Sequence, residues 1–273
     1  MKKNTVMKKR ITLLLLLFLS LSGFVLAYNN TYAVVVGVAD YKNYTPGDGD
    51  LNYTINDARS FAEFLKSKKG GAVPEENIVL LIDAQASKAN IVEKAKALFS
   101  KAKKDDRVIF YFSGHGSKGC FIPYDAGDIG NTLLYFNEVK AIFRTAKCNT
   151  KLLFADACFA GSMKTGLSSN SELKKSIEKG LKEASNMNIA VMMSCQGDET
   201  SIESSEWGNG LFTYYLMKGL GGDANRDGNQ FVTIQELYYY VYHQVQDKAA
   251  SRGHSQTPEL FGKFDLRLIV AKV

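Results

Sequence analysis

The sequence contains few of the residues that build metal sites and disulfide frameworks. Its 273 residues include three histidines and four cysteines, Cys120, Cys148, Cys158 and Cys195. The cysteines form no CxxC pair and no His/Cys spacing typical of zinc sites. Four cysteines are also too few to form a disulfide scaffold in a chain of this length. Composition therefore assigns no metal and no cofactor.

A strong excess of one charge is also missing once the first 27 residues are set apart. Those residues contain five of the 34 Lys and Arg residues and no acid, which leaves 29 basic against 28 acidic residues. The high isoelectric point is therefore mostly a property of the N-terminal segment. We predict neither a nucleic-acid partner nor a polybasic membrane-binding surface.

The N-terminal segment has the organisation of a targeting sequence. Lys2 to Arg10 form a basic head, Ile11–Leu21 is almost wholly apolar, and Val25–Ala27 places small residues near a cleavage point. This pattern indicates a secretory signal peptide at residues 1–27, and hence a secreted or periplasmic protein. The alternative is an uncleaved membrane anchor, although the apolar run is shorter than the ~20 residues of a full span.

The remaining residues, 28–273, alternate between strand and helix patterns and contain no repeat or second domain. Such alternation predicts one α/β domain whose central, mainly parallel sheet has helices on both faces. The expected strands are Tyr32–Val38, Asn77–Ile82, Arg107–Phe112, Lys151–Ala155, Ile189–Ser194 and an edge strand at Thr257–Lys263. The expected helices are Asn56–Lys69, Ser87–Lys103, Phe136–Ala146, Ser171–Ala184, Gly210–Gly219 and Ile234–Ala249.

One polar motif follows the strand predicted at Lys151–Ala155. After the apolar run the chain reads Asp156, Ala157, Cys158, and then Phe-Ala-Gly-Ser. Ligands of α/β proteins bind at the carboxyl ends of parallel strands, so Cys158 is placed for chemistry. The alternative is that Cys158 is a small buried apolar side chain, as many free cysteines are.

A second motif follows the strand predicted at Arg107–Phe112, where His115 stands between Gly114 and Gly116. The alternative for His115 is a structural histidine. The stretch Gly114–Gly119 also matches GxGxxG, but a dinucleotide site needs a helix to begin there. The following residues, Cys120–Tyr124, instead have the pattern of a strand or hairpin, which argues against nucleotide binding.

Together these motifs resemble those of a known family. The segments YFSGHGS (Tyr111–Ser117) and DACFAGS (Asp156–Ser162) are similar to the His and Cys motifs of caspase-like cysteine peptidases, most closely metacaspases and their bacterial relatives. Tyr32–Tyr41, Leu51–Ala58 and parts of the chain after Gly210 also resemble the family. The resemblance implies a caspase-like fold over residues 28–273 and cysteine endopeptidase activity on peptides or proteins.

The chemistry can also be stated from the residues alone. A cysteine thiol with a pKa of ~8.5 needs a base or a cation to form the nucleophilic thiolate. His115 is the candidate base, and it could later protonate the leaving amine. The oxyanion requires N–H donors, for which we expect the amides of Gly116 and Cys158. Cys195 also follows an apolar strand and is the rival nucleophile.

Three residues are candidates for substrate recognition. Asp156 is two positions before Cys158 and so points to the same face of its strand. Asp57 is near the start of the first helix, where the alternative is a charge that simply favours the helix dipole. The resemblance to metacaspases implies that Asp57, Asp156 and Ser113 form a pocket for Arg or Lys. One departure is Thr54, where metacaspases often have cysteine.

Calcium is considered because many metacaspases have an acidic loop after the His motif. Here Ser117–Tyr124 is short and contains no acid. Asp223–Asn229 begins like an EF-hand loop, but Glu236 comes two residues after the position of the bidentate glutamate. We therefore favour a polar turn before the helix near Ile234, and we assign no cofactor.

Two further hypotheses concern activity. Met163–Asn188 is rich in Ser and Lys, and the resemblance implies self-processing in this region; the alternative is a solvated helix with a capping box at Ser169–Glu172. The main alternative to peptidase function is a catalytically silent caspase-like protein that binds peptides or a partner.

Overall fold

The computed structural model describes residues 28–43, 50–117, 119–127, 132–157, 189–196 and 199–273. Three predictions lie outside these residues: the signal peptide at 1–27, the nucleophile Cys158, and the processing segment at 163–188 with its expected helix.

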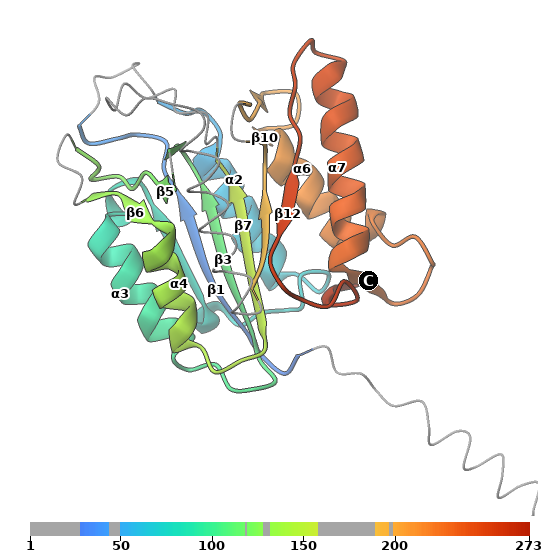
Figure 1. Cartoon of the computed structure of the whole chain (residues 1–273), viewed down its shortest axis with the longest axis horizontal. Helices are drawn as coiled ribbons and strands as arrows, with labels where there is room; N and C mark the ends of the chain where they lie inside the picture. The colour runs from blue at the N-terminus through green and yellow to red at the C-terminus, as the bar shows by residue number, and fades with distance from the viewer. Residues whose placement is uncertain (1–27, 44–49, 118, 128–131, 158–188, 197–198) are drawn as a thin grey trace, which may run out of the picture.

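A six-stranded sheet forms the centre of the molecule, with the strand order β12-β8-β7-β3-β1-β2 (Figure 1). Neighbouring strands are parallel, except that β12 runs antiparallel to β8 at one edge. The prediction of a mainly parallel sheet is confirmed. The strands are β1 (Thr31–Gly37), β2 (Ile78–Ile82), β3 (Arg107–Ser113), β7 (Thr150–Asp156), β8 (Ile189–Met193) and β12 (Glu259–Phe261).

The central strands are apolar on both faces because both faces are covered. Val34 and Phe110 belong to the hydrophobic cluster on one face, whereas Val35 and Tyr111 belong to the cluster on the other. All seven residues of β3 are buried. This explains why β3 has a nearly continuous apolar run instead of the alternation of a half-exposed strand.

The α-helices of the described residues cover the sheet in two groups (Figure 1). Helices α3 and α4 pack on one face, and α2, α6 and α7 pack on the other. Their bounds are α2 (Thr54–Lys66), α3 (Lys88–Phe99), α4 (Phe136–Thr145), α6 (Leu211–Lys218) and α7 (Ile234–Ala250). Within the described ranges, no helix is both long and apolar enough to span a membrane.

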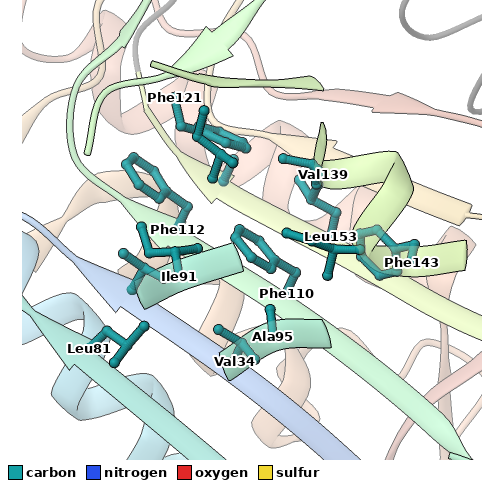
Figure 2. Packing of buried hydrophobic residues seen from close by; sticks show 14 of the residues in the cluster. Val34, Leu81, Ile91, Ala95, Phe110, Phe112, Phe121, Val139, Phe143 and Leu153 are labelled. Atoms are coloured by element: carbon teal, nitrogen blue, oxygen red, sulfur yellow. The ribbon is translucent and has the colours of Figure 1, made fainter. Parts of the chain in front are cut away.

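Aromatic and aliphatic side chains together fill the space between the sheet and the α3/α4 layer (Figure 2). The Phe112 and Phe121 rings stack with centroids 4.5 Å apart, and the Phe110 ring lies 6.4 Å from that of Phe143 on α4. Ile91 of α3 belongs to the same buried cluster. Such close packing gives the sheet a rigid base for the residues that follow its strands.

Several boundaries differ from the sequence prediction. The edge strand β12 is shorter than Thr257–Lys263, and α3 ends at Phe99 instead of near Lys103. The N–H groups of Lys101 and Ala102 bond three residues back, which closes α3 with tighter turns. The minor strands of the described residues form three small sheets, β4-β5-β6, β10-β9 and β11-β13. Their bounds are β4 (Gly116–Ser117), β5 (Cys120–Phe121), β6 (Leu134–Tyr135), β9 (Glu203–Ser204), β10 (Asn209–Gly210), β11 (Phe231–Thr233) and β13 (Ile269–Lys272).

The register of the central strands aligns the two predicted motifs. Gly37, Ser113 and Asp156 are paired neighbours in one row across β1, β3 and β7. The pairing continues past the strands, because the N–H of Gly114 donates to the Asp156 carbonyl at 3.1 Å. The segments that lead to His115 and Cys158 therefore leave the sheet side by side.

Candidate active site

His115 follows the end of β3 and is partly buried. Its backbone N–H donates to the Tyr41 hydroxyl at 2.6 Å, and the two rings lie 5.0 Å apart between centroids. A Cβ on Gly114 would lie 2.9 Å from this hydroxyl, so the glycine permits the close approach. Tyr41, which the sequence analysis did not single out, thus fixes the backbone that bears His115.

Gly116 begins β4 and pairs with Phe121 of β5. The carbonyl of His115 accepts the N–H of Ile122 at 3.0 Å, which ties the histidine to the same hairpin. A strand, β5, follows Gly119, as predicted, in place of the helix that a dinucleotide site would need. Within the GxGxxG pattern, Gly116 and Ser117 therefore form a short strand and do not begin a helix.

The chain that leads to Cys158 is described as far as Ala157. Ala157 is buried, and its N–H and carbonyl both contact the Ser194 hydroxyl at 3.2 Å. Cys158 itself lies outside the described residues. Its pairing with His115, and the oxyanion role given to its amide, therefore stay predictions.

Asp57 lies in the first turn of α2 and has no solvent exposure. Its Oδ1 accepts hydrogen bonds from the Asn209 side chain and the Gly210 N–H, both at 2.9 Å. Its Oδ2 accepts the Ser113 hydroxyl at 2.8 Å. The charge does lie at a helix N-terminus, but a simple helix charge would not be buried in this way.

Asp156, the last residue of β7, is 5% exposed. Its Oδ1 accepts the Ser201 hydroxyl at 2.6 Å. Its Oδ2 accepts the N–H and the hydroxyl of Thr213, at 3.1 and 2.8 Å. The Tyr111 hydroxyl lies 2.6 Å from the Thr213 hydroxyl and extends this network into the core.

Gly210 lies between the two carboxylates. A Cβ at this position would collide with Oδ2 of Asp156 and would lie 3.1 Å from Oδ2 of Asp57. The backbone of Gly210 is extended with a φ of −62°, so the glycine is needed for space and not for its conformation. Asp57, Ser113 and Asp156, which the resemblance to metacaspases groups in one pocket, thus lie together in the structure.

Burial makes this carboxylate pair hard to ionise. Burial, together with repulsion from Asp156, raises the pKa of Asp57 well above its ordinary value, while the bonds from Asn209, Ser113 and Gly210 oppose the rise. Burial likewise raises the pKa of Asp156, against the bonds from Ser201 and Thr213. In the part of the chain that the structure describes, the groups bonded to these carboxylates are all uncharged.

The sequence analysis missed Ser201, Asn209 and Thr213 as residues of this site. No local pattern marks them, because they reach the carboxylates only through long-range folding. Ser201 and Asn209 come from the segment between β8 and α6, and Thr213 lies in the first turn of α6, whereas Asp57 and Asp156 belong to the first 156 residues. Thr54 uses its hydroxyl to donate to the Val38 carbonyl at 2.8 Å, so here it holds the start of α2 against the end of β1.

The rival nucleophile Cys195 is 1% exposed, and its thiol lies 3.4 Å from the Glu199 carbonyl. Cys120 and Cys148 are buried as well. Burial raises the pKa of Cys120 to about 11 and also raises that of Cys148. Burial therefore opposes thiolate formation at Cys120 and Cys148, whereas a nucleophile needs surroundings that favour the thiolate.

The residues of the EF-hand-like loop bond to one another. Both carboxylate oxygens of Asp227 accept from Asn229, and Oδ1 of Asn229 accepts the Phe231 N–H at 2.6 Å. Glu236 caps α7 through Thr233, at 2.9 Å from its N–H and 2.7 Å from its hydroxyl. Among the described residues, no group of three His, Cys, Asp or Glu side chains is placed to hold a metal. The loop therefore has the internal hydrogen bonds of a polar turn that precedes α7.

Comparison with known proteins now identifies the fold and family. Residues 30–267 match the family described as "Caspase domain". The chain belongs to the caspase family. This caspase domain superposes on caspase-1 of Spodoptera frugiperda with a TM-score of 0.59, at 14% identity over 87% of this chain and 88% of that one. A protein of Geobacter sulfurreducens gives a TM-score of 0.61 at 16% identity, over 88% and 97% of the two chains. At these identities the likeness shows the fold alone.

Several curated relatives match by sequence, and two of them show how much of the chain is covered. A probable protease of a Desulfuromonadales bacterium is 26% identical over 84% of this chain and 31% of its own length. Metacaspase-1A of Aspergillus oryzae is 32% identical over 38% of this chain and 25% of its own length. The caspase domain therefore spans about a third or less of these relatives. They support the resemblance to caspase-like cysteine peptidases that the His and Cys motifs suggested.

Proposed function

We propose that the protein is an exported cysteine endopeptidase that cleaves after Arg or Lys by means of Cys158 and His115. Membership of the caspase family supports a peptidase, and the similarity to Metacaspase-1A supports the basic specificity. The observation that argues most for this specificity is the buried pair Asp57 and Asp156, which face each other across Gly210 beside the strand end that leads to His115.

The proposed reaction has two stages. His115 takes the proton of the Cys158 thiol, and the thiolate sulfur bonds to the carbonyl carbon of the scissile peptide. The amides of Gly116 and Cys158 stabilise the oxyanion. When the C–N bond breaks, His115 gives its proton to the leaving amine. Water then attacks the thioester; His115 takes its proton and returns it to the sulfur, which releases the acid.

The carboxylate pair would recognise the side chain at P1, the substrate residue before the cleaved bond. A guanidinium or ammonium placed between Asp57 and Asp156 would offset their repulsion and make charge-assisted hydrogen bonds. Arg should be preferred to Lys because its planar fork can engage both carboxylates at once. A peptide with Asp at P1 would add a third negative charge and should be nearly inert.

Peptides that differ only at P1 test this specificity. Turnover of Arg and Lys peptides should far exceed that of matched Leu and Asp peptides. Equal kcat/KM for the Arg and Leu peptides would remove the acidic-pocket argument and reopen the substrate class.

Variants of the dyad test the chemistry. Cys158→Ala and His115→Ala should each lower kcat by at least about 10³-fold, since residues that act as a unit lose nearly all their effect when one is removed. Cys195→Ala is the matched control and should retain activity. Loss of activity in Cys195→Ala with full activity in Cys158→Ala would show that Cys195 is the nucleophile.

Labelling separates an enzyme from a silent relative that only binds peptides. Iodoacetamide should alkylate Cys158 quickly in the wild-type protein and slowly in His115→Ala. A slow, His115-independent rate would favour the binding-only function.

Export and self-processing belong to the same proposal. We expect secretion into the periplasm or medium with loss of residues 1–27, so that only an uncleaved segment would associate with a membrane. We also expect cleavage after a lysine within Met163–Asn188. N-terminal sequencing of the secreted protein should show both cuts, and Cys158→Ala should show only the first. An intact chain in fully active protein would exclude processing as an activation step.

A further inference from the structure

Asn209 is the one side chain outside the predicted pocket that bonds directly to Asp57 in the described part of the chain. It is 7% exposed, and its amide donates to Oδ1 of Asp57 at 2.9 Å. The Gly210 N–H donates to the same oxygen, while the Ser113 hydroxyl occupies the other. Donors on both oxygens fix the plane of the carboxylate and not only its position.

Asn209 comes from a hairpin that also contacts the start of α2. Strand β10 pairs with β9, where Asn209 faces Ser204. The Glu203 carboxylate of β9 accepts the N–H groups of Asn52 at 3.0 Å and Tyr53 at 3.2 Å, just before α2. The hairpin therefore contacts both the beginning of the helix and the acid in its first turn, so it sets where Asp57 lies.

We propose that Asn209 is a positioning residue of the cation pocket, whose amide orients the Asp57 carboxylate toward the P1 side chain of the substrate. The proposal rests on the proposed function and extends it, because Asn209 itself need not touch the substrate. A buried carboxylate with one donor fewer can rotate about its Cβ–Cγ bond and lose the geometry that a cation requires.

The same hydrogen bond also bears on ionisation. Asp57 faces Asp156 of β7 and Tyr111 of β3, and Glu203 of β9 lies near Asp156; none of these groups is cationic. The charged form of Asp57 therefore depends on neutral donors. A donated hydrogen bond favours the ionised carboxylate, so loss of the Asn209 amide should make Asp57 take up a proton at higher pH.

The test compares Asn209→Leu with a matched control, Asn56→Leu. Asn56 precedes Asp57 and is exposed, and its amide donates to the Gly208 carbonyl of the same hairpin at 3.4 Å, without a bond to Asp57. We expect Asn209→Leu to lower kcat/KM for a P1-Arg peptide at least about tenfold, and to move the acid limb of its pH profile upward by about one unit. Asn56→Leu should stay within about twofold of the wild type, since exposed substitutions usually have small effects.

Two further measurements keep the result interpretable. Alkylation of Cys158 by iodoacetamide over the same pH range reports titration of the dyad, and the melting temperature reports folding. If Asn209→Leu does not fold, Asn209→Ala removes the amide without adding apolar bulk and provides the same comparison.

An unshifted acid limb in Asn209→Leu, or equal losses in both asparagine variants, would overturn the positioning role and leave Asn209 as a structural residue. That outcome differs from failure of the proposed function, which would show as equal cleavage of P1-Arg and P1-Leu peptides by the wild-type protein. P1-Arg selectivity in the wild-type protein, together with a shifted acid limb in Asn209→Leu, would support both the proposed function and the positioning role of Asn209.

Discussion

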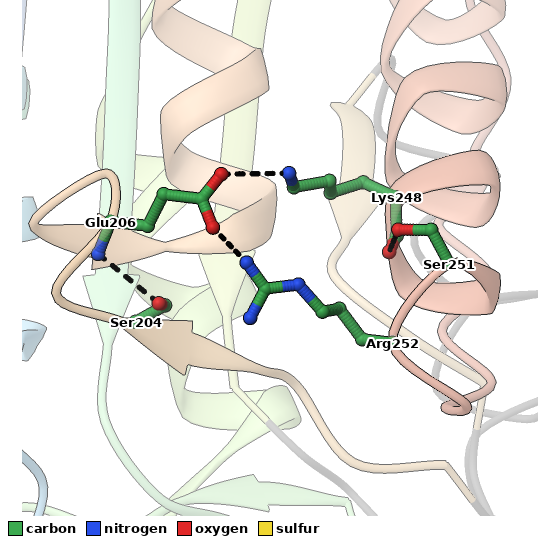
Figure 3. Close-up of polar contacts among 5 residues, drawn as sticks. All are labelled: Ser204, Glu206, Lys248, Ser251 and Arg252. Carbon is green, nitrogen blue, oxygen red and sulfur yellow. Dashed lines mark hydrogen bonds and ion pairs between the residues drawn. The ribbon is translucent and has the colours of Figure 1, made fainter.

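Carboxylates are held in two different ways in this molecule. Asp57 and Asp156 are buried, and the side chains and N–H groups that bond to them are uncharged across the described residues. Glu206 is about half exposed, and its carboxylate pairs with two cations, Lys248 of α7 at 2.8 Å and Arg252 just after that helix (Figure 3). Cationic side chains of the same chain thus neutralise the exposed acid, whereas the two buried acids face each other and are bonded to uncharged groups in the described part of the chain.

The difference shows which carboxylates serve stability and which are suited to binding. Water screens an exposed ion pair, which contributes little to stability and imposes little strain. Two buried carboxylates destabilise the fold unless a cation compensates them. An arrangement that is unfavourable in the free protein and favourable with a bound cation is the arrangement expected of a recognition site.

The largest effect should come from filling the space between the buried acids. Gly210→Ala would push its Cβ into Asp156, so kcat/KM for a P1-Arg peptide should fall by more than about 100-fold as both carboxylates move. Gly221→Ala is the control, because a Cβ there would meet only the end of the Lys69 side chain at 4.0 Å. Unchanged P1-Arg kinetics in Gly210→Ala would show that the carboxylates do not form the P1 site.

Neutralising a buried acid should lower kcat/KM much more than neutralising the exposed acid Glu206. Asp156→Asn keeps the shape but removes a charge, and we expect kcat/KM for the Arg peptide to fall about 10- to 100-fold, the value of one charge-assisted bond. Glu206→Gln should change it less than about twofold, since the Glu206 carboxylate bonds to Lys248 and Arg252 and its substitution leaves the bonds to the buried acids in place. Equal losses of kcat/KM in Asp156→Asn and Glu206→Gln would show that the buried acids have no special role in binding.

The buried acid Asp57 should make the stability of the folded protein depend on pH. Because the folded-state pKa of Asp57 is raised, the folded protein binds more protons than the unfolded chain between about pH 4 and that raised value. Stability is therefore greatest below this window and falls as the pH rises through it. Asp57→Asn should remove the contribution of Asp57 to this fall, while Asp156, whose pKa is also raised, retains its own. The variant should raise the free energy of unfolding at neutral pH by about 0.5–2 kcal/mol, although it impairs activity. Denaturation at pH 4 and pH 8 would measure the effect, and a variant that is less stable at pH 8 would contradict it.

The smallest effect should come from the surface pair. Glu206→Gln should lower the free energy of unfolding by at most about 1 kcal/mol, and less at high salt, because its partners are solvent-exposed. Urea unfolding at two salt concentrations would show this. A large, salt-independent loss would mean that the Glu206 contacts hold the β9–β10 hairpin in place.

The sequence was sufficient to predict the sheet and the ends of the two strands that lead into the motifs. The apolar runs of β3 and β7 end at Ser113 and Asp156, and the row that joins these residues follows from placing both strands in one parallel sheet. The acid at Asp57 could be predicted because a helix start and a family motif coincide there.

The partners of the acids could not be predicted from local patterns. Asn209 and Thr213 bond to residues 152 and 57 positions earlier in the chain. Their roles depend on strand order and on a hairpin of two-residue strands, which is too short to leave a periodic pattern in the sequence. The same holds for Tyr41, whose contact with His115 depends on the path of the loop after β1.

The pairing of β7 with β8 determines how the molecule would respond to a break in its chain. These strands lie on opposite sides of residues 158–188 and pair at five successive positions, from Lys151 with Ile189 to Ala155 with Met193. The Asp57 and Asp156 carboxylates, on the earlier side, are bonded by Asn209 and Thr213 on the later side. After cleavage of a peptide bond between β7 and β8, the two polypeptides should therefore stay associated as one folded domain. Co-expression of the two halves from separate genes should produce the same complex.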